Sequence, residues 1–268
     1  MKTTDSTHHK PITLAQISDS HLFSEPDGLH HGHNVLKNLK KILLHISQNP
    51  AIDYVVFTGD LTQDHSEKSY QNFVSAVHEC RLNLPLYYLA GNHDEPELLA
   101  KYFSDAPFLS DKTINHPHWQ VQLTTSKSST PAGFVSERAL ANLGRAIDSG
   151  KQQLVMMHHH PIDVGYFIDK HGLENKERFW QVIDMYDNIS AIACGHVHRG
   201  MKLNQTSTNS LAGTKKSVDV YTCPATSIQF DPDFDGVAAL AKGPGYRIFN
   251  LHSDGQLTSD VFICKYLK

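Results

Sequence analysis

The sequence of 268 residues has few cysteines, and its apolar residues form no long run. None of its apolar segments approaches the ~20 residues needed to cross a bilayer, and the polar start MKTTDSTHHKP has no signal-peptide core. There is no Cys-x-x-Cys spacing, which argues against a zinc knuckle and a disulfide framework. The four cysteines are Cys80, Cys194, Cys223 and Cys264. We therefore expect a cytoplasmic protein without a membrane partner.

The sequence also lacks an excess of basic charge. Its 24 Lys and Arg against 28 Asp and Glu give a net charge of −4, so no global positive field attracts nucleic acid, and we expect no nucleic-acid partner. Histidine, by contrast, is abundant, with 19 copies. Because imidazole is the commonest metal ligand among side chains, this count directs attention to a metal site.

Apolar periodicity predicts alternating strands and helices over the first two thirds of the chain, followed by strands alone. The predicted strands span 11–18, 52–58, 84–90, 119–124, 152–157, 189–194, 200–206, 217–223, 245–252 and 258–266. The predicted helices span 33–48, 66–82, 136–149 and 174–187. Turn-rich segments at 124–133 and 231–245 predict surface loops, and Asp254-Gly255 predicts a hairpin. This order favours an α/β fold in one domain, 1–268, whose first ten residues form a flexible tail.

Polar side chains follow five of the predicted strands directly. They are Asp19 and His21, Asp60, Asn92 with His93 and Asp94, His158 with His159 and His160, and His196 with His198. Taken singly, each motif is explained by a turn, a helix cap or a histidine with a structural role. Ligands of open α/β sheets bind at the carboxyl ends of strands, and five such ends carrying Asp, Asn or His together indicate a site.

The residue types at these positions suit a pair of metal ions. The set comprises Asp19, His21, Asp60, Asn92, His158, His196 and His198. Seven ligands exceed the four of a tetrahedral zinc site, and a central carboxylate such as Asp60 can bridge two cations ~3.5–4 Å apart. With one residue between them, His196 and His198 can each serve a different ion. Mixed imidazole and oxygen ligands favour Fe, Mn or Zn, as divalent or mixed-valence ions, over Mg alone.

The motifs D-x-H, G-D, G-N-H-D, H and G-H-x-H, in this order, resemble the signature of the calcineurin-like metallophosphoesterases across residues 19 to 198. The chain is more closely similar to bacterial class III 3′,5′-cyclic-AMP phosphodiesterases. The similar stretches include QISDSHLF, TGDLTQDHSEKSYQNF, MHHHPIDVGYFIDKHGLENKERF, CPATSIQFDPDF and GPGYRIFNLHSDGQL. The resemblance implies a two-sheet β-sandwich flanked by helices.

The resemblance also implies roles for single residues. One ion would be held by Asp19, His21, Asp60 and His198, and the other by Asp60, Asn92, His158 and His196. His158 is preferred to its two neighbours because the ligand in similar enzymes is the first histidine after the strand. Asp60 and His93 would be catalytic, with Asp94 orienting His93, and Asn92, His93 and His198 would contact the substrate. Relatives often carry Asp-Ser or Asp-Thr where this chain has Thr124-Thr125.

The implied reaction is hydrolysis of a phosphodiester, 3′,5′-cyclic AMP to 5′-AMP, by a hydroxide that bridges the two metals. His93 would assist the departing oxygen. One alternative is a glycerophosphodiesterase or a phosphodiesterase of broad specificity. An alternative of another class is a protein-binding scaffold without catalysis, although such proteins are expected to lose ligands and all seven matched positions are filled here.

Overall fold

The computed structural model describes residues 10–207 and 216–265, so the predicted tail, apart from Lys10, lies outside the described residues. The chain forms two sheets of six strands. In the first, the order is β14-β13-β1-β4-β5-β6. Its parallel strands are β1 (Ile12–Ile17), β4 (Tyr54–Phe57), β5 (Leu86–Tyr88) and β6 (Phe108–Leu109). Two antiparallel strands, β13 (Gly245–Leu251) and β14 (Leu257–Ile263), complete its edge.

The second sheet has the order β11-β12-β10-β9-β8-β7. Its parallel strands are β8 (Trp119–Leu123), β9 (Gln152–Met157), β10 (Ile189–Cys194) and β12 (Lys216–Thr222). Antiparallel strands close its two edges, β7 (Thr113–Asn115) beside β8 and β11 (Lys202–Ser207) beside β12. A small separate hairpin joins β2 (Leu29–His30) and β3 (His33–Asn34).

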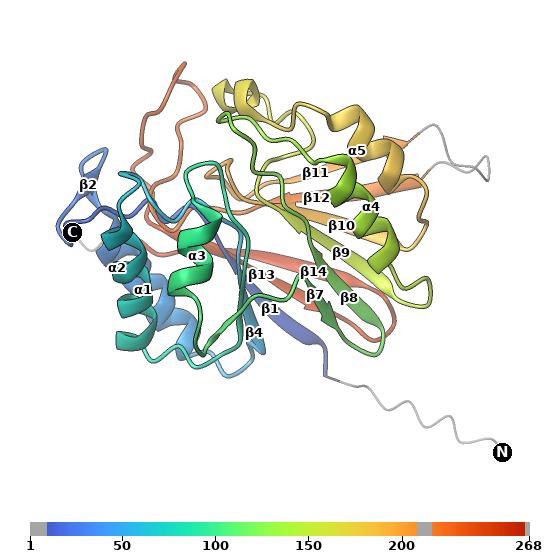
Figure 1. The fold of residues 1–268 in the computed structure, drawn as a ribbon, viewed down its shortest axis with the longest axis horizontal. Coiled ribbons are helices and arrows are strands. Elements are labelled where there is room, and N and C mark those ends of the chain that lie inside the picture. Colours follow the sequence, from blue (N-terminus) through green and yellow to red (C-terminus); the bar gives the residue numbers. More distant parts are fainter. Residues whose placement is uncertain (1–9, 208–215, 266–268) are drawn as a thin grey trace.

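Helices cover the outer face of each sheet (Figure 1). On one side lie α1 (Val35–Ser47), α2 (Glu67–Glu79) and α3 (Pro96–Tyr102), and on the other lie α4 (Glu137–Ala146) and α5 (Lys176–Ile183). A short 3-10 helix, η1 (Phe167–His171), precedes α5. Polar caps begin three of the helices, because Asn34, Ser66 and Ser136 each accept an N–H from the residue three positions on.

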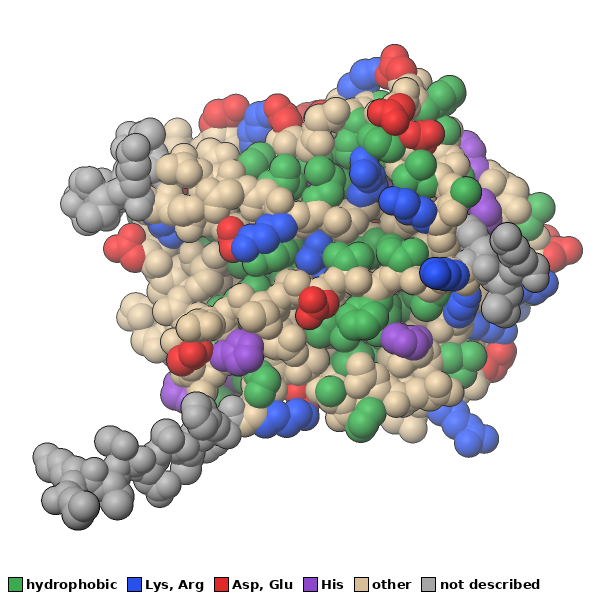
Figure 2. Space-filling model, turned by 180° about the vertical axis from the view of Figure 1, so that it is seen from behind, with side chains coloured by type: hydrophobic (Ala, Val, Ile, Leu, Met, Phe, Trp, Pro, Cys, Tyr) green, Lys and Arg blue, Asp and Glu red, His purple; other side chains and the backbone are tan. Residues whose placement is uncertain are grey.

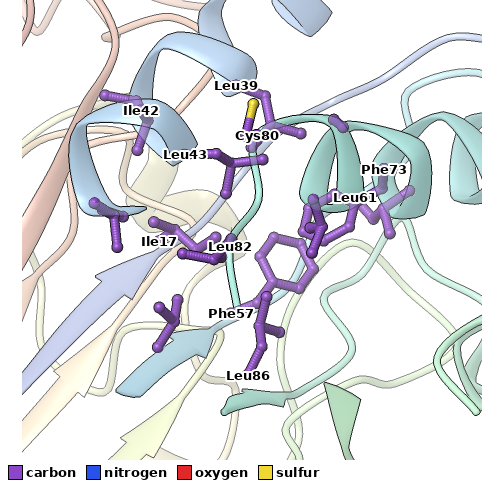
Figure 3. Close-up of a cluster of buried hydrophobic side chains, with 14 of the residues drawn as sticks. Ile17, Leu39, Ile42, Leu43, Phe57, Leu61, Phe73, Cys80, Leu82 and Leu86 are labelled. Atoms are coloured by element: carbon purple, nitrogen blue, oxygen red, sulfur yellow. The ribbon is translucent and has the colours of Figure 1, made fainter. Parts of the chain in front are cut away.

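Three apolar layers hold this arrangement together. The layer between the sheets includes Leu14 and Phe249 of the first sheet and Trp119 of the second, all fully buried. The neighbouring residues Ala15 and Ile17 point to the opposite face of β1, toward α1 and α2 (Figure 3). Both faces of the strand are therefore buried, which explains its continuous apolar sequence. A third layer joins the second sheet to α4 and α5.

The two-sheet sandwich flanked by helices confirms the expected fold class. The β-rich last third both extends the first sheet, through β13 and β14, and supplies two strands of the second. The Asp254-Gly255 turn joins β13 to β14 as predicted, with Gly255 at φ 84°. Sequence analysis did not assign the β2–β3 hairpin, α3, β6, β7 or η1, which are short elements.

The surface seen in Figure 2 intersperses Lys and Arg with Asp and Glu, and neither sign of charge covers a large area of this face. Within the described part of the chain, no helix is long and apolar enough to cross a membrane.

Candidate metal centre

The residues predicted as metal ligands lie just past the carboxyl ends of five strands, β1, β4 and β5 of one sheet and β9 and β10 of the other. The structure brings all seven together: Asp19, His21, Asp60, Asn92, His158, His196 and His198. Apart from the half-buried Asn92, each is at most 5% exposed. Six polar side chains buried in one place require partners, since an unpaired buried polar group is costly.

The ligand atoms form two adjoining groups. In the first, Nε2 of His21 lies 3.1 Å from Nε2 of His198, which is 3.4 Å from Oδ1 of Asp19. Oδ2 of Asp60 is 3.7 Å from Nε2 of His21. The first group therefore combines two imidazoles and two carboxylates.

The second group shares Asp60 with the first. Nε2 of His158 lies 3.3 Å from Oδ2 of Asp60 and 3.1 Å from Oδ1 of Asn92. Nδ1 of His196 is 3.2 Å from the same His158 nitrogen. His196 and His198, separated by one residue, thus face different groups, and the Asp60 carboxylate lies between them.

Five of the seven residues have a left-handed backbone, which is uncommon for residues other than glycine. Their φ angles lie between 45° and 65°: Asp19, His21, Asp60, His196 and His198. Such conformations cost about 1–3 kcal/mol each and persist where the surrounding structure fixes them, typically at functional sites. This concentration of strain is a second, independent indication of function, and it does not depend on the side chains.

Two glycines allow the strand ends to approach this closely. A Cβ atom on Gly91 would lie 2.1 Å from Oδ1 of Asp60, and one on Gly195 would lie 2.1 Å from Oγ of Ser18. Neither side-chain atom has room to move away, because both residues are buried. The glycines of the G-N-H-D and G-H-x-H motifs are therefore required by packing around the ligands.

Residues 12–200 match the family model described as calcineurin-like phosphoesterase. The chain belongs to this family. The family membership confirms the resemblance inferred from the motifs and the expectation of a metallophosphoesterase enzyme.

Two similar proteins bear the names of cyclic nucleotide phosphodiesterases, and a solved structure has a similar fold. A probable cyclic nucleotide phosphodiesterase of Colwellia psychrerythraea is 67% identical over 256 residues, which cover 96% of each chain. The 3′,5′-cyclic adenosine monophosphate phosphodiesterase CpdA of Vibrio vulnificus is 30% identical and covers 96% of this chain and 92% of its own. Among solved structures, a dimetal phosphatase from Danio rerio has a similar fold, with a TM-score of 0.62 and 13% identity over 94% of this chain and 99% of that chain.

The donor set of this metallophosphoesterase fits a cation. Nδ1 of His158 donates to the carbonyl of Thr58 at 2.7 Å, which leaves a lone pair on Nε2 of the neutral ring. That lone pair faces the oxygens of Asn92 and Asp60, which are themselves acceptors. Acceptors placed this closely repel one another unless a proton or a metal ion lies among them, and the divalent metals of the family meet this need.

Without a metal, a proton takes this position. Burial alone would raise the pKa of Asp60, but the adjacent His158 lowers that pKa well below its usual value. Burial would likewise lower the pKa of His158, yet Asp60 raises it to about 9. The metal-free pair is therefore a buried carboxylate and imidazolium that exchange their proton for a cation on metal binding.

His93, predicted to be catalytic, lies at the edge of the two groups. Its backbone N–H donates to Oδ1 of Asp60 at 3.0 Å, and its ring meets His21 edge-on, with centroids 4.9 Å apart. On the other side it stacks on His65, with centroids 5.5 Å apart. Burial lowers the pKa of His93, so its ring is neutral near pH 7.

Asp94 has a different partner from the one expected. Its carboxylate accepts three backbone N–H groups, from Asp60 at 2.8 Å, Leu61 at 2.7 Å and Gly91 at 2.8 Å, rather than contacting the ring of His93. Asp94 therefore fixes the turn that carries Asp60.

His159 lies close to His158 and His196, but other groups use both of its ring nitrogens. Nδ1 is 2.9 Å from Oγ of Ser126, and Nε2 is 3.2 Å from the carbonyl of Pro131. His159 thus anchors the loop 124–133 to the site. Nε2 of His158, by contrast, lies close to the oxygens of Asp60 and Asn92.

Several residues outside the predicted ligand set also contact the site. Nζ of Lys127 donates to the carbonyl of Asn92 at 3.1 Å, and Nε2 of His160 lies 3.1 Å from Oδ1 of Asp169. The hydroxyl of Tyr166 donates to the carbonyl of Val197. The motif match around residues 166–173 pointed toward this region, whereas no pattern indicated Lys127.

Proposed function

We propose that this chain binds two metal ions, one held by Asp19, His21, Asp60 and His198 and the other by Asp60, Asn92, His158 and His196. The observation that carries the proposal is the position of Oδ2 of Asp60, 3.7 Å from His21 and 3.3 Å from His158. Fe, Mn or Zn would suit these nitrogen and oxygen ligands. When bound, two such cations neutralise phosphoryl charge and make water acidic near neutral pH.

The proposed reaction is the opening of 3′,5′-cyclic AMP to 5′-AMP. Support comes from the relative that is 67% identical over 96% of this chain and bears the name probable cyclic nucleotide phosphodiesterase. A cytoplasmic location fits such a substrate and stays a prediction.

The role proposed for His93 is assistance to the leaving O3′ oxygen. Its Nδ1 is buried without a hydrogen-bond partner among the described residues, so we assign the contact with the substrate to Nε2. Because the ring is neutral, a proton on Nε2 can be donated to the oxygen as negative charge develops there. His65 stacks on the other face of the ring and limits its movement.

A panel of substrates tests this proposal. Protein stripped of metal and refilled with Mn²⁺ or Fe²⁺ is assayed on 3′,5′-cAMP, 3′,5′-cGMP, 2′,3′-cAMP and glycerophosphodiesters. We expect the highest kcat/KM for 3′,5′-cAMP, two metals per chain by elemental analysis, and no turnover for Asp60→Ala. If kcat/KM were higher for glycerophosphodiesters, the proposed substrate would be wrong, but the proposed metal centre would stand. Inactivity on every phosphodiester, with both metals bound, would favour the scaffold alternative.

A further inference from the structure

The turn His196–Val197–His198 places two proposed ligands on a strained backbone. His196 and His198 have φ angles of 65° and 55°, and Val197 between them is fully buried. Two left-handed residues within three positions need support from outside the turn. The segment that supplies this support lies some thirty residues earlier in the chain.

Tyr166 reaches the middle of the turn. Its hydroxyl donates a hydrogen bond to the carbonyl of Val197, and the bond is buried. The carbonyl of Val197 belongs to the peptide that joins Val197 to His198, so this bond restrains the backbone between the two histidines. Tyr166 is 9% exposed and lies directly before η1.

Asp169 fixes the segment that carries Tyr166. Its carboxylate accepts the backbone N–H groups of Val164 and Gly165, each at 2.8 Å, and lies 3.1 Å from Nε2 of His160. The His160 ring in turn stacks on His196, with centroids 5.7 Å apart and planes 23° apart. The Asp169 carboxylate therefore holds the segment in a turn and connects it, through His160, to the proposed ligand His196.

A third contact reaches the other ligand. The ring of Phe167 packs against Phe230 with centroids 5.2 Å apart, and Phe230 stacks on His198 with centroids 3.8 Å apart and planes 6° apart. The segment 164–169 thus acts on each residue of the turn: on His196 through His160, on Val197 directly, and on His198 through Phe230.

We propose that the segment 164–169, here called the brace, positions His196 and His198 for metal binding, with Tyr166 and Asp169 as its positioning residues. The proposal rests on the proposed function insofar as both histidines are ligands. Partners of this kind behind metal ligands typically change metal affinity about 10–100-fold when removed. Substitutions in the brace should therefore change metal affinity more than they change the free energy of unfolding.

Tyr166→Phe tests the brace by removing one oxygen atom, and Tyr246→Phe is the matched control. Tyr246 is also buried, and its hydroxyl pairs with Nδ1 of His45 at 2.8 Å, which is not one of the proposed ligands. Mn²⁺ is titrated into each metal-free protein by calorimetry, and urea unfolding of the metal-free proteins is measured beside it. We expect Tyr166→Phe to weaken Mn²⁺ binding by about tenfold or more and excess Mn²⁺ to restore turnover, while Tyr246→Phe binds as the unchanged protein does.

Substitution of His160 tests the link through Asp169. Glutamine places an amide N–H near the position of Nε2 and can still donate to Asp169, whereas asparagine is too short to do so. We expect His160→Gln to bind Mn²⁺ more tightly than His160→Asn. The reverse order would overturn the role of Asp169.

The outcomes separate the brace from the proposed function. Equal Mn²⁺ affinity in Tyr166→Phe and the unchanged protein overturns the brace but leaves the metal centre intact. Equal weakening in both tyrosine variants overturns it as well, since general destabilisation then explains the effect. If the unchanged protein binds no Mn²⁺, Fe²⁺ or Zn²⁺, the proposed function fails and the brace has nothing to position.

Discussion

Asp94 offers the sharpest test of how the site is held together. Its carboxylate is fully buried and accepts the backbone N–H groups of Asp60, Leu61 and Gly91 at 2.7–2.8 Å. Asp60 and Gly91 both donate to Oδ2, and Leu61 donates to Oδ1. Replacing Asp94 by asparagine or alanine therefore removes one or both of these acceptor oxygens from a place that water does not reach.

The two substitutions differ in the donors they leave unpaired. Asparagine can place its oxygen at the Oδ2 position and keep two bonds, while its NH₂ faces the N–H of Leu61. A buried donor without a partner costs about 1–3 kcal/mol, so Asp94→Asn should lower the free energy of unfolding by about 1–3 kcal/mol. Alanine leaves three donors unpaired, so Asp94→Ala should cost about 3–9 kcal/mol, a large part of the 5–15 kcal/mol that typically separates folded from unfolded protein.

Urea unfolding of the metal-free proteins measures both costs, because bound metal would add its own stabilisation. Asp163→Ala is the control: the side chain of Asp163 is 67% exposed and pairs only with Lys176, so little stability should be lost. If Asp94→Ala lost no more stability than Asp163→Ala, or if the two Asp94 variants were equally stable, the count of backbone donors would be wrong.

Four further predictions concern the site itself. Alanine in place of His93 should lower turnover by about 10²–10⁴-fold and keep both metals, whereas Asp60→Ala should abolish turnover; equal residual rates at unchanged metal content would refute this division. Mn²⁺ affinity of the metal-free protein should rise up to about pH 9, where Asp60 no longer holds a proton on His158, and calorimetry showing no rise from pH 6 to 8 would contradict it. The same ion pair stabilises the metal-free fold fully between pH 3.8 and 6.5, the ordinary pKa values of the two groups, and loses this effect as the pH rises through about 9. Gly91→Ala should eliminate metal binding measured by elemental analysis, since its Cβ would lie 2.1 Å from Oδ1 of Asp60, whereas Gly150→Ala, with a nearest contact of 3.3 Å, should retain both metals.

Local sequence predicts the strands and the position of the site for a physical reason. The strands β1, β4, β9 and β10 are buried on both faces, so they appear as apolar runs, and the first polar residues after them necessarily lie at the carboxyl edge of a sheet. His196 and His198 were recognisable because they follow the buried run of β10 directly. The Gly255 turn was recognisable because its φ of 84° favours glycine.

The parts that sequence did not predict depend on distant contacts. The helix α3 has seven residues, of which only Leu99 is buried, so it shows no helical periodicity. Strands β2, β3 and β6 have two residues each and exist only through their pairing. The contact of Tyr166 with Val197 likewise has no local signature, because a tyrosine near a short helix packs equally well in many surroundings.

The left-handed backbones and the packing between the sheets together hold the ligand atoms close to one another. Left-handed conformations at Asp19, His21 and Asp60 turn the side chains of the first sheet toward those of the second, where His196 and His198 are turned in the same way. The packing between the sheets, with Leu14 and Trp119 fully buried, holds the two edges at a fixed separation, so the ligand atoms cannot move apart to relieve their repulsion. A metal ion between them, or a proton in the metal-free protein, relieves the repulsion without moving the backbone. Metal affinity in this fold should therefore depend on the residues that hold the edges in place as well as on the ligands themselves.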